Sequence, residues 1–207
     1  MAYSGCGEVS YDMDNPADLV IDFVNTYDVE SDADSIPSPA ALTAWLAGRG
    51  LIGPGEVADE TDLATAVDLR EGLRAALRHN HGRPGGENGD RHEDRDRDRR
   101  RDGDGLPRAF AALPLRVALT TDGPVLEPVA TGVPGGLAGI AGAVMSTRAG
   151  GMWPRLKVCT ESTCQWAFVD SSKNRSRSWC SMRVCGNRTK TRAYRARRQT
   201  EPGSRHL

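Results

Sequence analysis

The sequence predicts an α+β protein in two parts. The first is a mainly helical N-terminal domain with a small antiparallel β element, and the second is a small cysteine-bearing C-terminal domain that ends in a basic helix. Three observations support this prediction. Apolar residues recur at helical spacing before residue 80, two β-type runs flank a turn near residue 122, and four cysteines cluster near the C-terminus. We expect domains at 1–150 and 151–207.

Apolar patterning defines the elements before residue 80. The apolar run 19–26 is too short for periodicity to decide between helix and strand. A helix is expected to start at the prolines 37 and 39 and to end at the glycines 48 and 50. A further helix is expected from Asp62 to about Leu77, because its apolar residues recur near helical spacing with charged residues between them. These apolar residues are Leu63, Val67, Leu69, Leu73 and Leu77.

A charged segment separates these helices from the elements that follow. Residues 82–105 contain seven Arg, eight acidic residues and, apart from Pro84, no aliphatic or aromatic side chain. We expect a solvated, disordered insert, with RNA binding by its Arg–Asp alternation as the alternative. After it, the runs 115–121 and 125–129 flank a turn at 122–124 and predict a hairpin. A helix of small residues is expected from Leu137 to about Arg148.

Charge is distributed unevenly along the 207 residues. Residues 1–150 carry 14 basic and 25 acidic residues, a net charge of −11, whereas 151–207 carry 13 basic and 3 acidic residues, a net charge of +10. This asymmetry predicts an anionic partner for the C-terminal part. The longest stretch of mostly small and apolar residues, 137–145, is far shorter than the roughly 20 residues of a membrane helix. The first 14 residues lack the pattern of a secretory signal. We expect a cytoplasmic protein.

The cysteines Cys159, Cys164, Cys180 and Cys185 follow the pattern C-x4-C-x15-C-x4-C. Two short pairs separated by a loop are typical of a tetrahedral zinc site, and a small segment with few aliphatic residues needs such a support. Disulfides require an oxidising compartment, and iron–sulfur sites usually show closer spacings. No histidine lies within this span, so we expect one structural zinc ion held by four thiolates. The C-terminal domain is therefore interpreted as a zinc finger.

A basic helix is expected directly after the last cysteine. Gly186 suits a tight turn around the metal, Asn187 suits a helix cap, and nothing from Arg188 to Gln199 breaks a helix. Arg188, Arg192 and Arg195 fall on one face of this helix, which favours nucleic-acid binding over a merely solvated basic tail. The candidate nucleic-acid-binding residues are Arg188, Lys190, Arg192, Arg195, Arg198, Arg175 and Arg177.

The segment from Cys159 to Arg198 closely resembles the CGNR zinc finger, on the motifs 166–171, 177–182 and Cys185-Gly-Asn-Arg-x-Lys190. Upstream, the residues 19–26, Leu42-x-x-Trp45-Leu46 and 69–77 are similar to the ABATE domain that usually precedes this finger. The resemblance implies a bacterial stress-induced transcription regulator whose finger binds DNA and whose N-terminal domain senses a small ligand. The charged insert departs from the compact family pattern.

Asp22 and Asn25 are the weakest candidates. On a helix they would share a face and could line a ligand pocket, whereas as structure alone they would be cap and turn residues. No G-x-S-x-G or P-loop motif occurs in the chain, so an enzyme is not expected.

Two function classes remain open at this point. The first is a ligand-responsive DNA-binding regulator, associated with the nucleoid. The second is a zinc module that binds RNA or a protein, with the N-terminal domain as an adaptor. Because arginine contacts to phosphate carry no sequence information, the sequence does not separate these two classes.

Overall fold

The computed structural model describes residues 15–81, 105–121 and 123–200, and it confirms the α+β class. Helices alternate with short antiparallel strand pairs over this part of the chain. The helices are α1 (Pro16–Val24), α2 (Pro39–Ala47), α3 (Glu60–Arg78), α5 (Gly105–Ala112), α6 (Gly132–Ala149) and α7 (Asn187–Thr200). The strand pairs are β1 (Tyr27–Asp28) with β2 (Ala33–Asp34), β3 (Leu115–Thr120) with β4 (Gly123–Pro128), and β5 (Leu156–Val158) with β6 (Ala167–Val169).

The run 19–26, which periodicity left undecided, lies mostly in helix α1. Asn15 caps this helix, since its Oδ1 accepts a hydrogen bond from the backbone N–H of Ala17 at 3.1 Å, and Pro16 occupies the first helical position. Four apolar residues of α1 are fully buried: Val20, Ile21, Phe23 and Val24. Together with Ala17, these residues recur at helical spacing, whereas Asp18 and Asp22 are only partly buried. The apolar run 19–26 by itself was too short to show this period.

The other expected elements before residue 150 are confirmed, with shifted ends. Helix α2 is capped by Ser38 and α3 by Asp59, which together with Asp62 forms a capping box. The hairpin pairs Val117 with Leu126. Helix α6 starts five residues before the expected position, at Gly132. Helix α5 was not expected, and it begins at Gly105, the last residue of the predicted insert. The rest of that insert, 82–104, lies outside the described residues.

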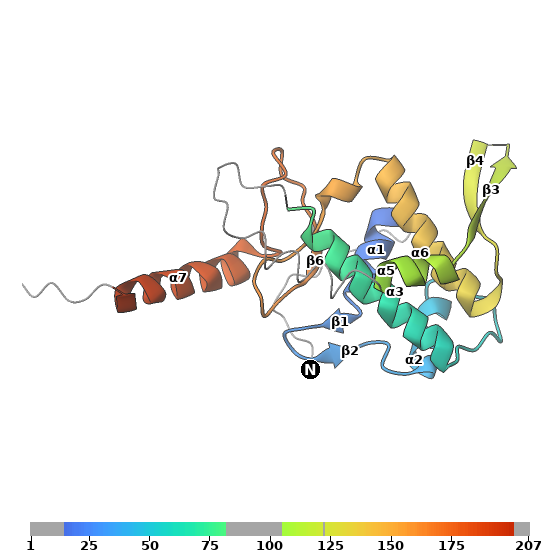
Figure 1. Cartoon of the computed structure of the whole chain (residues 1–207), viewed down its shortest axis with the longest axis horizontal. Coiled ribbons are helices and arrows are strands. Elements are labelled where there is room, and N and C mark those ends of the chain that lie inside the picture. The colour runs from blue at the N-terminus through green and yellow to red at the C-terminus, as the bar shows by residue number, and fades with distance from the viewer. Residues whose placement is uncertain (1–14, 82–104, 122, 201–207) are drawn as a thin grey trace, which may run out of the picture.

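Figure 1 shows the helices α1, α3, α5 and α6 gathered in one body, with α7 projecting from one end and the hairpin β3–β4 at the other. The core of this body comprises apolar side chains from α1, α2, α3 and α6. Helices α3 and α5 lie unusually close together. A Cβ added to Gly72 would come within 2.6 Å of the Leu106 Cβ. Gly72 is therefore required for this approach.

The cysteine-bearing segment is docked on the helical body. Leu156, Val158 and Ala167 of β5 and β6 belong to the same apolar core as the N-terminal helices. The buried Arg74 of α3 donates to the carbonyl oxygens of Gln165 (3.0 Å) and Val24 (2.7 Å). We conclude that strands β5 and β6 form part of the hydrophobic core of the whole protein.

Candidate metal centre and basic helix

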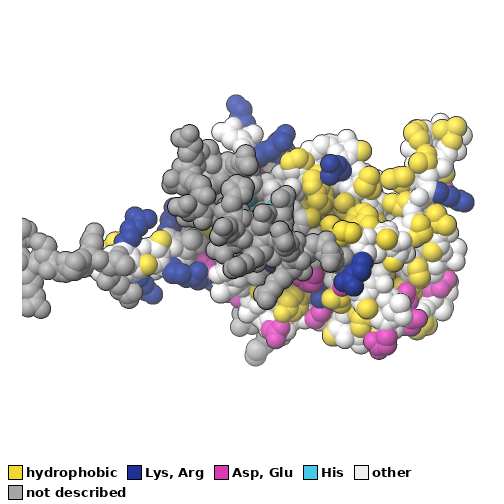
Figure 2. Space-filling view, in the orientation of Figure 1, with side chains coloured by type: hydrophobic (Ala, Val, Ile, Leu, Met, Phe, Trp, Pro, Cys, Tyr) yellow, Lys and Arg dark blue, Asp and Glu magenta, His cyan; other side chains and the backbone are white. Residues whose placement is uncertain are grey.

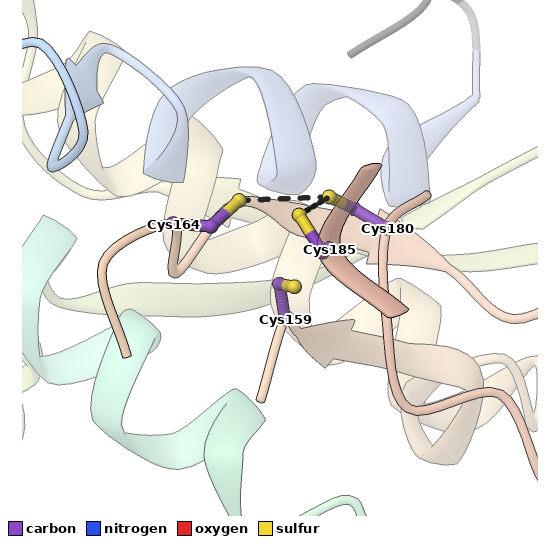
Figure 3. Close-up of side chains that lie close together, drawn as sticks. All are labelled: Cys159, Cys164, Cys180 and Cys185. Carbon is purple, nitrogen blue, oxygen red and sulfur yellow. Dashed lines mark hydrogen bonds between the residues drawn. The ribbon is translucent and has the colours of Figure 1, made fainter. Parts of the chain in front are cut away.

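The four predicted zinc ligands come from two turns and converge on one point (Figure 3). Cys159 follows β5 and Cys164 precedes β6, so the first pair lies on the connection between these strands. Cys180 ends the loop after β6, and Cys185 lies in a π-helical turn, Met182–Gly186, which leads into α7. All four Sγ atoms lie within 4.8 Å of one another.

The separations between the sulfur atoms fit a tetrahedral zinc site. The Sγ of Cys180 lies 3.6 Å from that of Cys164 and 3.7 Å from that of Cys185. Four sulfurs bound tetrahedrally at about 2.3 Å from zinc would lie about 3.8 Å apart, whereas a disulfide needs about 2.05 Å. Since the donors are thiols alone, zinc held by all four cysteines would form a closed, structural site.

The mutual influence of the thiols explains why the cluster favours a cation. Hydrogen bonds from Cys164 and Cys180 lower the pKa of Cys159. The hydrogen bond to Cys159 raises the pKa of Cys164 and of Cys180, and burial together with the Cys159 charge raises the pKa of Cys185 to about 11. Most of these shifts oppose ionisation, because several thiolates this close together repel one another. A divalent ion would stabilise the four thiolates together.

Two local expectations about the last cysteine are corrected. Gly186 lies inside the π-helical turn rather than in a tight turn, and a Cβ on it would come within 2.5 Å of the Sδ of Met182, a flexible and exposed side chain that would have to shift. Asn187 does not act as the cap, because helical backbone already begins at Met182. Ser181 caps the turn instead, since its Oγ accepts from the N–H of Val184 at 3.3 Å.

Glu161, which the sequence analysis did not identify, connects the metal centre to helix α7. It lies between the first two cysteines, and its buried carboxylate accepts hydrogen bonds from Thr189 Oγ1 (2.8 Å) and Arg192 Nη2 (2.9 Å). Burial raises the pKa of Glu161, but the hydrogen bonds from Thr189, Arg192 and Thr163 outweigh it and lower the pKa overall. An ionised, buried carboxylate beside the cysteines thus fixes the first turns of α7.

A second buried charge pair shapes the loop before Cys180. Lys157 Nζ and Asp170 Oδ2 are 2.7 Å apart, with side chains that are 2% and 0% exposed. Asp170 also accepts from the backbone N–H of Ser172 and Arg177. Burial raises the pKa of Asp170, but the hydrogen bonds from Lys157 and Ser172 outweigh it and hold the pKa well below its usual range. This pair sets the path of the chain between β6 and Cys180.

The predicted nucleic-acid-binding residues differ in their surroundings. Arg188 pairs with Glu30 at 2.7 Å, and Arg192 pairs with Glu161. The guanidinium of Arg177 donates to the carbonyl oxygens of Trp179 and Cys180 and lies 4.9 Å from the centre of the Phe168 ring. The remaining predicted residues are exposed, and they are Arg175, Lys190, Arg195 and Arg198. The basic residues of α7, called the basic stripe below, therefore have an inner end that contacts acidic residues, Arg188 and Arg192, and an outer end that faces solvent, Arg195 and Arg198.

The predicted ligand residues Asp22 and Asn25 both contact protein groups. Asp22 forms an ion pair with Arg49. The amide of Asn25 pairs with Ala167 of β6, accepting from its N–H at 2.8 Å and donating to its carbonyl at 3.0 Å. Asn25 thus joins the end of α1 to the cysteine-bearing strands, which agrees with the structural alternative given for it above.

The fold and the site together define a zinc-finger protein with a helical N-terminal domain. Comparison with protein families agrees: residues 17–151 match the ABATE family, described as "Putative stress-induced transcription regulator", and residues 155–198 match the CGNR zinc finger. The ABATE match covers more than half of the chain, so the protein belongs to this family. A search of curated proteins found no match. Among the described residues, no helix is long and apolar enough to cross a membrane.

Proposed function

We propose that this protein is a zinc-dependent transcription regulator that binds duplex DNA through helix α7. In this proposal, the units 1–150 and 151–207 act as sensor and DNA reader, and the regulator works in the cytoplasm, on the nucleoid. The observation that carries the proposal is the composition and position of α7. The helix contains six basic residues and no acidic residue, it follows the turn that holds Cys185, and it projects from the rest of the molecule (Figure 1). A basic helix on a fixed base is suited to lie along DNA phosphates or in a groove.

The two ends of the basic stripe have different proposed roles. Lys190, Arg195 and Arg198 are exposed and supply the phosphate contacts. Arg192 and Thr189 are held by the buried carboxylate of Glu161, so they orient the helix relative to the zinc site. Arg188 is one-third exposed and is paired with the surface residue Glu30, so DNA phosphate would compete with that carboxylate for it.

The test is DNA binding by the zinc-loaded full chain at several salt concentrations. Each phosphate neutralised contributes about −0.9 to the slope of log affinity against log salt. We expect the double variant Arg195→Gln/Arg198→Gln to bind more weakly and to flatten the slope by about two units. The matched control is Arg116→Gln, since Arg116 lies on the hairpin far along the chain from α7 and pairs with Glu127 there. An unchanged slope in the double variant would contradict the proposed contacts.

RNA is the second candidate ligand for α7, and one observation favours it. Tyr194 is 59% exposed on the basic helix, with the Arg198 guanidinium 5.7 Å from its ring centre. Exposed aromatic and arginine planes stack on unpaired bases. Tyr194→Leu should leave duplex binding within about twofold if DNA is the ligand. RNA would be favoured if Tyr194→Leu lowers the affinity for single-stranded RNA tenfold or more and if the unchanged protein binds this RNA more tightly than duplex DNA. Binding to neither would leave a protein partner.

A further inference from the structure

A pocket of about 530 Å³ lies on the helical body between α3, α5 and α6. Its volume falls in the range of small-molecule sites, roughly 300–1,000 Å³. The wall is mainly apolar, with Leu73 and Ala76 from α3, Leu106 and Phe110 from α5, and Val144 and Met145 from α6. In the space-filling view, hydrophobic side chains gather on the surface near α5 and α6 (Figure 2). Neither Asp22 nor Asn25 lines this pocket.

The polar groups that line the pocket favour an anion. Arg148, in the last turn of α6, is exposed, and within the described residues its guanidinium has no carboxylate or carbonyl partner. Aspartate and glutamate are absent from the described lining. His79 Nδ1 donates to the Ala75 carbonyl oxygen at 2.9 Å, which leaves Nε2 of the neutral ring as an acceptor, so Arg148 is the group in this lining that attracts an anion. A cation beside an apolar wall is complementary to a molecule with an apolar body and one negative group.

The neighbouring segment of the chain has no suitable side chain to occupy this wall. Residues 82–104 connect the end of α3 to α5, and apart from Pro84 they contain no aliphatic or aromatic residue. A segment of this composition offers few apolar groups that match Phe110 and Leu73. A separate molecule with an apolar body is the better occupant.

We propose that this pocket binds a hydrophobic aromatic carboxylate. The ring system lies against the apolar wall, which includes Phe110, and the carboxylate pairs with Arg148. One part of this proposal rests on the proposed function, namely that the bound carboxylate is the signal to which the regulator responds. The pocket wall contacts the segment that leads into the finger, because the Asn80 amide donates to the carbonyl oxygens of Trp153 (2.7 Å) and Leu156 (2.8 Å). Leu156 begins β5, the strand that precedes Cys159.

The test is calorimetric titration of the zinc-loaded full chain with 2-naphthoate and with its neutral analogue 2-naphthylmethanol. For a ligand of this size, we expect a Kd of about 0.1 mM for the carboxylate and at least tenfold weaker binding of the alcohol. Arg148→Met should reduce carboxylate binding to the level of the alcohol, and Arg148→Lys should restore part of it. Arg116→Met, the same change on the hairpin, should leave both affinities unchanged.

A second variant tests the location of the binding site. Ala76→Phe should fill the pocket and abolish binding of both ligands, with zinc content and melting temperature measured to show that the protein is folded. Equal affinity for the two ligands, no effect of Arg148→Met, or no binding of 2-naphthoate at millimolar concentration would each overturn the proposal. DNA binding is measured on the same samples without ligand. Failure of ligand binding with intact DNA binding overturns this inference alone, and the reverse result overturns the proposed function alone.

Discussion

The helical body and the zinc finger are stabilised by different kinds of interaction. In the body, apolar side chains from several helices are fully buried, among them Ile21, Leu69 and Ile140. Around the four cysteines, the packed side chains are few, and they are Phe168, Trp166, Trp179 and Val184. Buried polar groups take the place of an apolar core there, namely the thiols, the Lys157–Asp170 pair and Glu161. A region with so little apolar burial depends on a few specific polar contacts, so the loss of one contact should have a large local effect.

Removal of zinc should have the largest effect and should separate the two regions. Structural zinc sites contribute about 10–16 kcal/mol in small peptides. We expect Cys180→Ser to abolish stoichiometric zinc binding and to expose the amides of residues 170–198 to hydrogen exchange. The helices α1, α3 and α6 should stay protected, because their core does not include the cysteines. Elemental analysis and hydrogen-exchange mass spectrometry measure both outcomes, and slow exchange in 170–198 without zinc would contradict the prediction.

Breaking the buried Lys157–Asp170 pair should have the next largest effect. Removing one partner of a buried ion pair costs about 3–5 kcal/mol. We expect Asp170→Asn to lower the free energy of unfolding by this amount at pH 7. Since the folded pKa of Asp170 lies below the unfolded value of about 3.9, the contribution is present above that pH and is lost as the pH falls through the folded pKa.

Urea unfolding of both proteins between pH 3 and 7 checks this sign. The difference between wild type and Asp170→Asn should be constant above about pH 5 and should shrink below about pH 4. Zinc content is measured for both proteins at each pH, because protonation of the thiolates releases zinc. A difference that grows on acidification would mean that the carboxylate is not ionised in the folded protein.

Val158→Ala tests whether strand β5 belongs to the core of the body. Val158 is 1% exposed and lies one residue before the first zinc ligand, yet it packs in the N-terminal core. We expect a loss of about 1–3 kcal/mol in the unfolding of the whole protein, with zinc content unchanged. Thermal unfolding followed by circular dichroism measures it. A loss confined to the finger would place β5 in a separate unit.

Glu161→Gln should lower the free energy of unfolding by a smaller amount, and it should loosen the orientation of α7. Its partner Arg192 is 56% exposed, so the loss should be about 1–2 kcal/mol. Zinc content should not change, whereas exchange of the first turns of α7 should become faster and DNA affinity should fall. Glu30→Gln is the matched control, since Glu30 pairs with Arg188 at the surface and should contribute less than about 1 kcal/mol. Equal effects of the two changes would argue against a positioning role for Glu161.

Replacement of the charged segment should have the smallest effect. Residues 82–104 lack an apolar anchor, and shortening a loop by half changes stability by only about 0.6 kcal/mol. We expect a short Gly/Ser linker in their place to alter the melting temperature by a few degrees at most. A large loss of stability would show that these residues contribute to the folded structure.

The sequence by itself determined the features that depend on local patterns. The spacing of the cysteines predicted a zinc site whose sulfur atoms do converge, because a tetrahedral metal requires ligands at such spacings. The helical period predicted α3, and a turn between two β-type runs predicted β3 and β4. In each case, residues close in the chain carry the signal.

Only the tertiary structure decided features whose partners lie far apart in the chain. Helix α1 was undecided because the apolar run 19–26 is too short for its period to separate a helix from a strand. Glu161 and Arg192 are 31 residues apart, and Asn25 and Ala167 are 142 residues apart. Such pairings arise from packing rather than from local propensity, so the residues that orient α7 and dock the finger were not predicted in these roles. Packing also decides which of the predicted basic residues are free to contact a ligand. Arg188, Arg192 and Arg177 contact protein groups in the folded chain, although they carry the same charge as the exposed residues Arg195 and Arg198.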